Sequence, residues 1–406
     1  MASSYLQSRI EIFRHRPFMW YTISCLVAMF GNGLTYIAMS WALVEMGEGV
    51  GSIAILMTCF WAPTVLIGPI FGVYVDRFQR RDVILFANTM RLVMLLLFWF
   101  CSDSFYTPMS IYLLALGIGA MLAMYMPAAM ALVREVVSED ELLIANSTVD
   151  IAYELGAVAG MGAAGLIIAA TSIPHTFLIN AIFYIMANVS LFMMHHKVPD
   201  HKSSNSVWED LVEGTMYVLR NRALLMIYSI QMMVFISYMT APILLAPFAR
   251  HVLHASVGQF GIIEASASVG LVVGSFITPY FAQRFSFLRI LLIELFLLAG
   301  AFYAFSYNSD IIWSYVWYFM IGFGFSVWPL LVTEAQDETD LALQGRVQAF
   351  FNSFSGIGIL LIYAFMLFIG DQYSLEYLYL SEIFIVLLGA LLLYIFEKTH
   401  RQRLVH

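Results

Sequence analysis

Six ionisable residues lie within long apolar stretches of the chain, where a charge is costly. They are Asp150, Glu154, Glu264, Glu294, Glu382 and Arg91. An ionisable group at the centre of a membrane helix costs about 2.5–3.5 kcal/mol on insertion scales and indicates a functional site by default. A buried carboxyl group that binds and releases a proton is what a proton carrier needs. The alternative for each residue is a hydrogen bond between helices.

Other chemistry is hard to find in this sequence. No Walker-type phosphate loop, acidic catalytic dyad or His/Cys metal cluster occurs. Cys25, Cys59 and Cys101 all fall in or at the end of apolar segments, where a small buried hydrophobic residue is expected. We therefore expect neither an enzyme nor a cofactor or metal site.

The composition is that of a membrane protein. Hydrophobic residues make up 61% of the 406 positions and charged residues only 11%, with a mean hydropathy of +0.83. A soluble domain carries about 25% charged residues, so most of this surface must face lipid. The apolar blocks are continuous and about 20 residues long, which favours helices over the alternating strands of a barrel.

The sequence predicts an all-α membrane protein with twelve transmembrane helices. The predicted spans are 18–44, 52–75, 83–101, 109–133, 146–170, 174–194, 223–249, 257–281, 288–307, 311–333, 347–369 and 375–396. They divide the chain into a six-helix half at 1–194, a linker at 195–222 and a second six-helix half at 223–406. The linker is the longest hydrophilic stretch, and it is suited to an amphipathic helix on the membrane surface.

Basic residues predict the orientation. With both termini inside, 17 of the 19 Lys and Arg residues lie in inner loops and tails, as the positive-inside rule requires. Arg91 lies within the third span and Arg250 lies outside. We expect a multi-pass protein of the bacterial inner membrane with both termini in the cytoplasm.

The two halves share a pattern. A shift of 207 residues aligns the second span with the eighth, so that Gly51-Ser-Ile-Ala-Ile55 faces Gly258-Gln-Phe-Gly-Ile262. The same shift places Arg77-Phe78 opposite Arg284-Phe285. Two pseudo-symmetric halves therefore follow, as in many transporters.

A motif joins the second and third spans on the predicted cytoplasmic side. It reads Gly72-Val-Tyr-Val-Asp76-Arg77-Phe78-Gln79-Arg80-Arg81, and it resembles the signature loop of the major facilitator superfamily. Gly72 permits close helix approach, and Asp76 suits a neighbouring helix N-terminus. We expect a gating motif formed by Gly72, Asp76, Arg77, Arg81, Arg91, Gly345 and Arg346, in which Asp76 faces the start of span eleven and Arg91 pairs with the Asp76 loop.

Further segments resemble one branch, the macrolide-efflux proteins and the enterobactin exporter. They are Pro127-Ala-Ala with Val136-Val-Ser-Glu-Asp-Glu-Leu142, Phe177-Leu-Ile-Asn180-Ala181, Glu213-Gly214 and Gly345-Arg346-Val347. The resemblance implies the major facilitator fold and export, usually proton-coupled, by alternating access. The chain departs from the antiporter pattern at Gly160-Met161, where Gly-Pro is usual, and at Gln283, which corresponds to Asp76.

In the resembled fold, spans 1, 4, 7 and 10 surround the cavity and spans 2, 5, 8 and 11 flank it. Glu264 and Glu154 then lie on flanking helices and are the predicted proton-coupling residues, whereas Glu294 and Glu382 lie on peripheral helices and are expected to be structural. The predicted substrate cavity is lined by Asn32, Tyr36, Gln231, Tyr238, Trp328, Asn352 and Phe354.

The predicted function is secondary active export of an amphiphilic small molecule, a drug or siderophore, with protons as the coupling ion. An importer or lipid transporter on the same fold and a non-transporting membrane receptor are the alternatives. We expect a monomer in the lipid bilayer with a small-molecule substrate and no nucleic acid.

Overall fold

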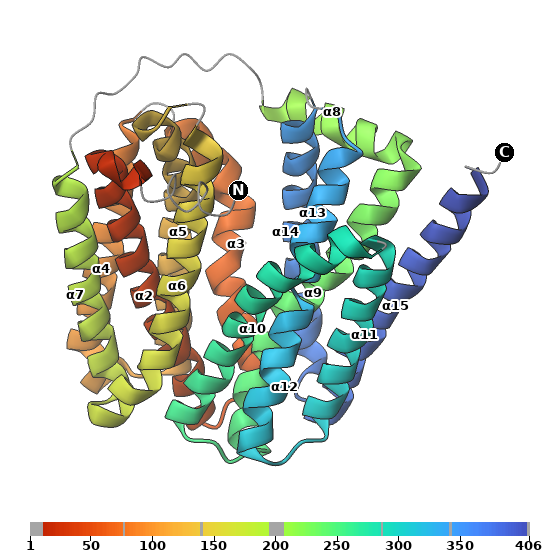
Figure 1. The fold of residues 1–406 in the computed structure, drawn as a ribbon. Coiled ribbons are helices and arrows are strands. Elements are labelled where there is room, and N and C mark those ends of the chain that lie inside the picture. The colour runs from red at the N-terminus through yellow and green to blue at the C-terminus, as the bar shows by residue number, and fades with distance from the viewer. Residues whose placement is uncertain are drawn as a thin grey trace. The chain divides into compact units, whose positions relative to one another are not determined.

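A computed structural model of the chain describes residues 11–75, 78–138, 141–194, 207–285, 287–340 and 343–403. Helices account for every regular element within these ranges (Figure 1). The elements are η1 (Ile12–Arg14), α2 (Arg16–Glu45), α3 (Val50–Val75), α4 (Arg80–Phe105), α5 (Pro108–Val136), α6 (Leu142–Ala170), α7 (Ile173–Phe192), α8 (Val207–Arg220), α9 (Arg222–His251), α10 (Val257–Arg284), α11 (Phe287–Ser306), α12 (Ile311–Gly324), α13 (Val327–Asp337), α14 (Gln344–Ile369) and α15 (Leu375–Arg403).

Twelve segments in the described ranges are long and apolar enough to cross a membrane, which confirms the predicted all-α architecture. Large apolar side chains are exposed along them, and Phe100 is 80% exposed. In water, an exposed apolar surface of this extent would make protein molecules associate with one another. An exposed apolar surface of this kind suits the acyl chains of a bilayer.

The tenth span is divided, which the sequence analysis did not predict. It consists of α12 and α13, separated at Phe325 and Ser326. Gly322 and Gly324 weaken the helix just before the break, since glycine costs about 1 kcal/mol relative to alanine in a helix. The hydroxyl of Ser326 then lies near Thr278 of α10, at 2.9 Å between the oxygens.

Local sequence signals determine where the helices begin. The side chains of Thr107, Ser172, Asn221, Ser256 and Asp310 each accept a hydrogen bond from a backbone N–H in the first turn of the following helix. These groups satisfy donors that the helix leaves without a partner. These five helix starts are therefore encoded locally.

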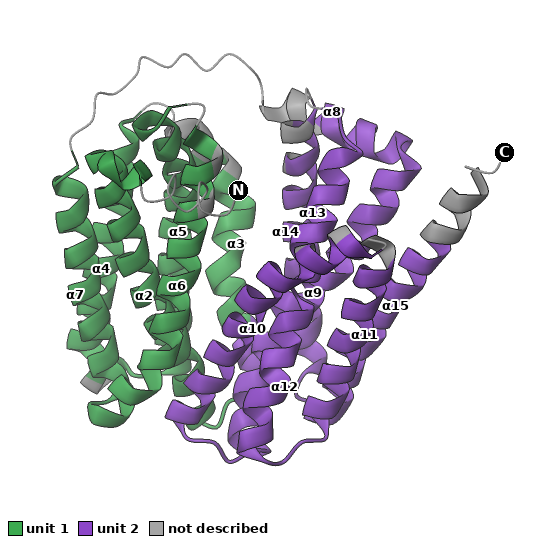
Figure 2. Cartoon of the chain, in the orientation of Figure 1, with its two compact units in different colours: residues 1–48, 55–204 green, residues 49–54, 205–406 purple. Residues whose placement is uncertain are grey.

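Contacts divide the chain into two compact units (Figure 2). Unit 1 consists of residues 1–48 and 55–204, and unit 2 consists of residues 49–54 and 205–406. In unit 1, α2 packs extensively on α6, and in unit 2 α10 packs extensively on α12. A Cβ on Gly160 of α6 would lie 2.0 Å from the carbonyl oxygen of Phe30, so these backbones pack closely because a glycine separates them.

Candidate functional site

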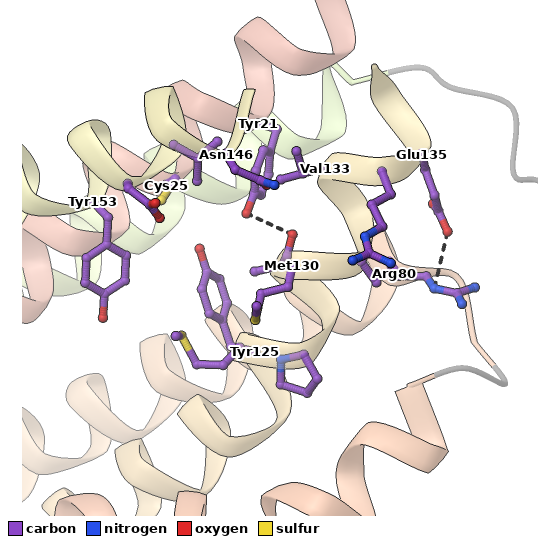
Figure 3. Close-up of a pocket in the computed structure, with 16 residues that line it drawn as sticks. Tyr21, Cys25, Arg80, Tyr125, Met130, Val133, Glu135, Asn146 and Tyr153 are labelled. Carbon is purple, nitrogen blue, oxygen red and sulfur yellow. Dashed lines mark hydrogen bonds and ion pairs between the residues drawn. The ribbon is translucent and has the colours of Figure 1, made fainter. Parts of the chain in front are cut away.

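A pocket with a volume of about 580 Å³ opens within unit 1. Its walls come from α2, the start of α4, the second half of α5 and the first half of α6 (Figure 3). The lining residues are Tyr21, Cys25, Arg80, Tyr125, Met126, Pro127, Ala129, Met130, Ala131, Val133, Arg134, Glu135, Asn146, Val149, Asp150 and Tyr153.

Aromatic and apolar groups form most of the pocket wall. Tyr21, Tyr125 and Tyr153 contribute rings from three different helices, α2, α5 and α6 (Figure 3). The hydroxyl of Tyr21 donates to the carbonyl oxygen of Ala129 at 3.2 Å and so connects α2 to α5. Met130 adds a polarisable, flexible side chain, which adapts to apolar ligands of varied shape.

Charged groups also line the pocket. Arg80 and Glu135 form an ion pair with 3.2 Å between Nε and Oε1, and both side chains are buried. Arg134 and Asp150 also line the pocket, and both are exposed. The pocket therefore combines an apolar wall with groups of both charges, which suits an amphiphilic ligand.

The predicted cavity residues of the first half lie elsewhere. Asn32 is on α2, but its amide oxygen accepts a hydrogen bond from the Tyr184 hydroxyl at 2.6 Å. Tyr36, also on α2, is half-buried. Neither residue lines the pocket. Tyr125 and Tyr153 were not predicted from the sequence, although Tyr125 stands directly before the methionine and proline of a membrane span, which is a usable signal.

The predicted cavity residues of unit 2 differ in exposure and in their contacts. Gln231 is 1% exposed and Tyr238 packs edge-on against Phe325 with 5.2 Å between ring centroids. Asn352 is exposed and accepts a hydrogen bond from Gln348 at 3.0 Å. Phe354 is also exposed.

Trp328 belongs to an aromatic cluster of unit 2. Its ring lies 5.2 Å from that of Phe235 on α9 and 5.8 Å from that of Phe351 on α14. Tyr228 stacks on Phe351 at 5.0 Å. This cluster connects α9, α13 and α14.

The two predicted proton-coupling residues occupy different units. Glu264 on α10 is 7% exposed, and Glu154 on α6 is half-buried, one turn beyond Asp150 of the pocket. Tyr379 interacts electrostatically with Glu264 and also with Glu382. A role in proton coupling stays a prediction for both residues.

The two peripheral glutamates bind hydroxyl groups of neighbouring helices. Glu382 accepts a hydrogen bond from Thr240 at 2.6 Å. Glu294 accepts one from Thr278, and Ser326 lies 3.5 Å from the same carboxylate oxygen. Each glutamate therefore connects its own helix to another within unit 2.

The predicted gating motif is described only in part. Asp76 and Arg77 lie outside the described residues, as do the surroundings of Gly72 and Gly345, which belong to α3 and α14. Arg81 donates to the carbonyl oxygen of Met194 at 2.8 Å. Arg346 forms an ion pair with Glu213 of α8 at 2.6 Å.

The expected pairing of Arg91 with the Asp76 loop stays a prediction, because Asp76 lies outside the described residues. Arg91 lies eleven residues beyond the start of α4, about 16 Å along the helix axis. Its guanidinium carbon lies 5.0 Å from the ring centroid of Tyr125 and 5.8 Å from that of Tyr184. Among the described residues its contacts are thus aromatic.

No group of three His, Cys, Asp or Glu residues is arranged to hold a metal ion in the part of the chain that the structure describes. Its twelve apolar helices instead define a class, the polytopic helical membrane proteins. The sequence matches the Major Facilitator Superfamily over residues 21–354 and again over 227–405. The chain therefore belongs to the Major Facilitator Superfamily, a family of membrane transporters of small molecules.

Two proteins of Bacillus subtilis (strain 168) resemble the chain over part of its length. An uncharacterized MFS-type transporter, YvqJ, is 20% identical over 193 residues, which are 47% of this chain and 46% of the relative. A second uncharacterized MFS-type transporter, YfiS, is 26% identical over 141 residues, 35% of this chain and 33% of the relative. The matches thus span less than half the length of these relatives.

Solved structures share the fold over nearly the whole chain. The nucleoside transporter NupG has a TM-score of 0.75 at 15% identity, with 94% of this chain and 99% of that chain covered. A bacterial homologue of the iron transporter ferroportin in an inward-facing state has a TM-score of 0.73 at 12% identity, with 94% and 98% covered. At such identities the likeness shows the fold alone.

Proposed function

We propose that this protein is a secondary active transporter that exports an amphiphilic small molecule in exchange for protons by alternating access. The observation that carries the proposal is the pocket in unit 1. It lies among membrane-spanning helices and combines tyrosine rings, methionines and charged side chains. The resemblance of several short motifs to macrolide-efflux proteins and the enterobactin exporter supports export.

The pocket wall suits a substrate with a large apolar part. Met126, Met130 and Val133 contribute apolar surface from α5, and each buried CH₂ of a ligand gains about 0.8 kcal/mol on leaving water. Tyr21, Tyr125 and Tyr153 add rings that pack on planar or aliphatic groups while their hydroxyls serve polar ones. A substrate that is wholly polar would leave this wall unused.

Proton coupling is assigned to Glu264, with Glu154 as the second candidate. Glu264 is nearly buried in a span, where a carboxyl group changes charge only when its access to water changes. Exchange of its proton for substrate gives antiport, because each event changes which state of the carrier is preferred.

The experiment is transport by purified protein in liposomes, with a panel of fluorescent amphiphiles and an imposed pH gradient. Wild type is expected to concentrate at least one amphiphile against its gradient only when the pH gradient is present. Glu264→Gln resembles the protonated form, so it should retain substrate exchange and lose uphill transport. The Glu154→Gln variant is measured in parallel.

Glu382→Gln is the matched control. This glutamate is also buried in unit 2, and the glutamine oxygen can still accept the hydrogen bond from Thr240. It should therefore keep wild-type coupling. Uphill transport by Glu264→Gln with an unchanged pH dependence would show that Glu264 is structural.

Import is the second candidate, because the nucleoside transporter NupG has the same fold. The liposome assay separates the two directions when the proton gradient is imposed with either sign. Accumulation of nucleosides or other polar substrates, with no flux of amphiphiles, would overturn the export proposal.

A further inference from the structure

Arg91 is a guanidinium in the interior of unit 1 without a carboxylate partner among the described residues. Its side chain is 0% exposed. Nε and both terminal nitrogens are buried and have no hydrogen-bond acceptor among the described residues. The Tyr184 hydroxyl donates its own hydrogen to Asn32, and its oxygen lies close enough to the guanidinium to interact with it. No described carboxylate lies within 4.0 Å, the ion-pair limit, of the guanidinium.

Such an arrangement is unfavourable unless something compensates for it. Arginine carries five N–H donors and stays charged inside proteins. A buried charge without a carboxylate partner costs several kcal/mol, and stacking on Tyr125 and Tyr184 recovers about 2 kcal/mol for each ring. A helix built only for stability would carry an apolar residue at this position. The guanidinium is therefore a candidate binding group for an anion.

Tyr125 lies between the Arg91 guanidinium and the pocket. Its ring lies 5.0 Å from the Arg91 guanidinium, and the same residue lines the pocket. Tyr153, which also lines the pocket, interacts electrostatically with Arg91. The positive charge thus lies one aromatic ring behind the pocket wall, and rotation of the Tyr125 side chain would expose it to a ligand.

A second polar group accompanies Arg91 on the same helix. Asn88 is 0% exposed, and neither its amide nitrogen nor its amide oxygen has a hydrogen-bond partner among the described residues. Residues three apart share one face of a helix, so Asn88 and Arg91 are adjacent on α4. Together they offer a charged fork and an amide N–H₂, a donor set that matches a carboxylate.

We propose that Arg91, assisted by Asn88, binds the anionic head group of the substrate, a carboxylate on an apolar body, behind Tyr125. This inference rests on the proposed function, in which the pocket of unit 1 receives an amphiphile. The apolar wall takes the body, and the guanidinium takes the charge. A neutral or cationic amphiphile gains nothing from Arg91.

The test is ligand-induced thermal stabilisation of the detergent-solubilised protein. The probes are benzoate, 2-naphthoate and decanoate, each compared with its own carboxamide, and sodium chloride alone as the inorganic anion. At least one carboxylate is expected to stabilise wild type more than its carboxamide does. Arg91→Met should bind that carboxylate at least about tenfold more weakly, the loss of one charge-assisted contact.

A second readout needs no ligand. Because the methionine removes a buried charge and keeps an apolar chain, Arg91→Met is expected to melt at or above the wild-type temperature.

Arg91→Lys retains the charge without the forked donors and should bind the carboxylate with intermediate strength. Arg284→Met is the matched control, because Arg284 also stacks on a tyrosine, Tyr280, at 4.4 Å but is exposed in unit 2. It should keep wild-type binding.

Three results would overturn the proposal. If carboxylates and carboxamides stabilise the wild type equally, the protein has no anion site. Equal carboxylate selectivity in wild type and Arg91→Met would place the site elsewhere. If sodium chloride alone stabilises the wild type as much as the carboxylates do, Arg91 binds an inorganic ion and not the substrate. Binding in detergent is independent of transport, so carboxylate selectivity without export in liposomes would contradict the proposed function and leave the anion site intact.

Discussion

Glu294 shows how hydroxyl groups accommodate a carboxyl group inside the membrane, with no cation beside it among the described residues. Its Oε1 accepts a hydrogen bond from Thr278 of α10, and the Ser326 hydroxyl at the start of α13 lies 3.5 Å away. Three helices thus meet at one side chain. Hydrogen bonds between membrane helices contribute about 0.6 kcal/mol on average and about 1.7 kcal/mol at most.

From this geometry we predict that Glu294→Gln is tolerated and Glu294→Leu is not. The glutamine oxygen still accepts from Thr278, so stability should change little. Leucine removes the carboxylate acceptor and leaves the Thr278 and Ser326 hydroxyls only each other as partners, which should cost about 1 kcal/mol. Thermal unfolding in detergent measures both variants. A double-mutant cycle with Thr278→Val should give a coupling energy of about 0.5–1.5 kcal/mol, and zero coupling would show that the bond does not stabilise the bundle.

The sequence identified the charged residues of the interior because a charge in an apolar stretch is conspicuous. Glu294 and Glu382 were expected to be structural, and the structure places hydroxyl partners beside both. The tyrosines around Arg91 were not identified. Tyrosine is common on lipid-facing and interface positions alike, so its presence in a span does not indicate which way it points.

Among the helices, the contact between α2 and α6 depends on small residues. A Cβ on Gly160 would lie 2.0 Å from the Phe30 carbonyl oxygen, which is backbone and cannot rotate away. A Cβ on Gly300 of α11 would meet nothing within 4 Å. The two glycines therefore offer a matched pair, one at a helix contact and one in open space.

We predict opposite effects for alanine at these two positions. Gly160→Ala forces α2 and α6 apart, and overpacking of this kind costs about 1–3 kcal/mol. Gly300→Ala fills no occupied space and should stabilise α11 by about 0.5–1 kcal/mol, because alanine loses less backbone entropy than glycine. Thermal unfolding of the two purified variants measures both changes in stability. Equal melting temperatures would show that the α2–α6 contact relaxes freely.

Helix boundaries were predicted less well than helix number. The apolar run at 311–333 indicates one span, whereas the structure divides it between α12 and α13. Hydropathy measures only the length of an apolar segment, so it registers neither Gly322 and Gly324 before the break nor the contact of Ser326 with Thr278 on another helix. Contacts of this kind are tertiary and leave no mark on local hydropathy.

The same limit applies to α8. The sequence suggested an amphipathic helix between the halves, and α8 forms at Val207–Arg220. Its contacts could not be derived from the pattern. Glu213 pairs with Arg346 at 2.6 Å, and a Cβ on Gly214 would lie 2.3 Å from the carbonyl oxygen of Arg346. The helix thus packs closely against the start of α14.

For the whole molecule, twelve spans could be predicted because their cause is global. Every backbone polar group in a bilayer must be satisfied within the segment, so each apolar block of about 20 residues must be a helix. The binding pocket could not be derived in this way. It arises from four helices, α2, α4, α5 and α6, whose facing sides depend on packing.

Orientation in the membrane is the last prediction, and it follows from charge alone. If the loops rich in Lys and Arg stay in the cytoplasm, then a cysteine placed at Asp103 or Ser309 faces outside and one at Gln79 or Ser204 faces inside. In a cysteine-free background, an impermeant thiol reagent added to intact cells should label only the first two. In the wild type, the native Cys101, which is exposed and lies two residues before Asp103 in the sequence, should react with the same reagent. Labelling of Gln79→Cys and Ser204→Cys before the membrane is opened would invert the topology and place both termini outside.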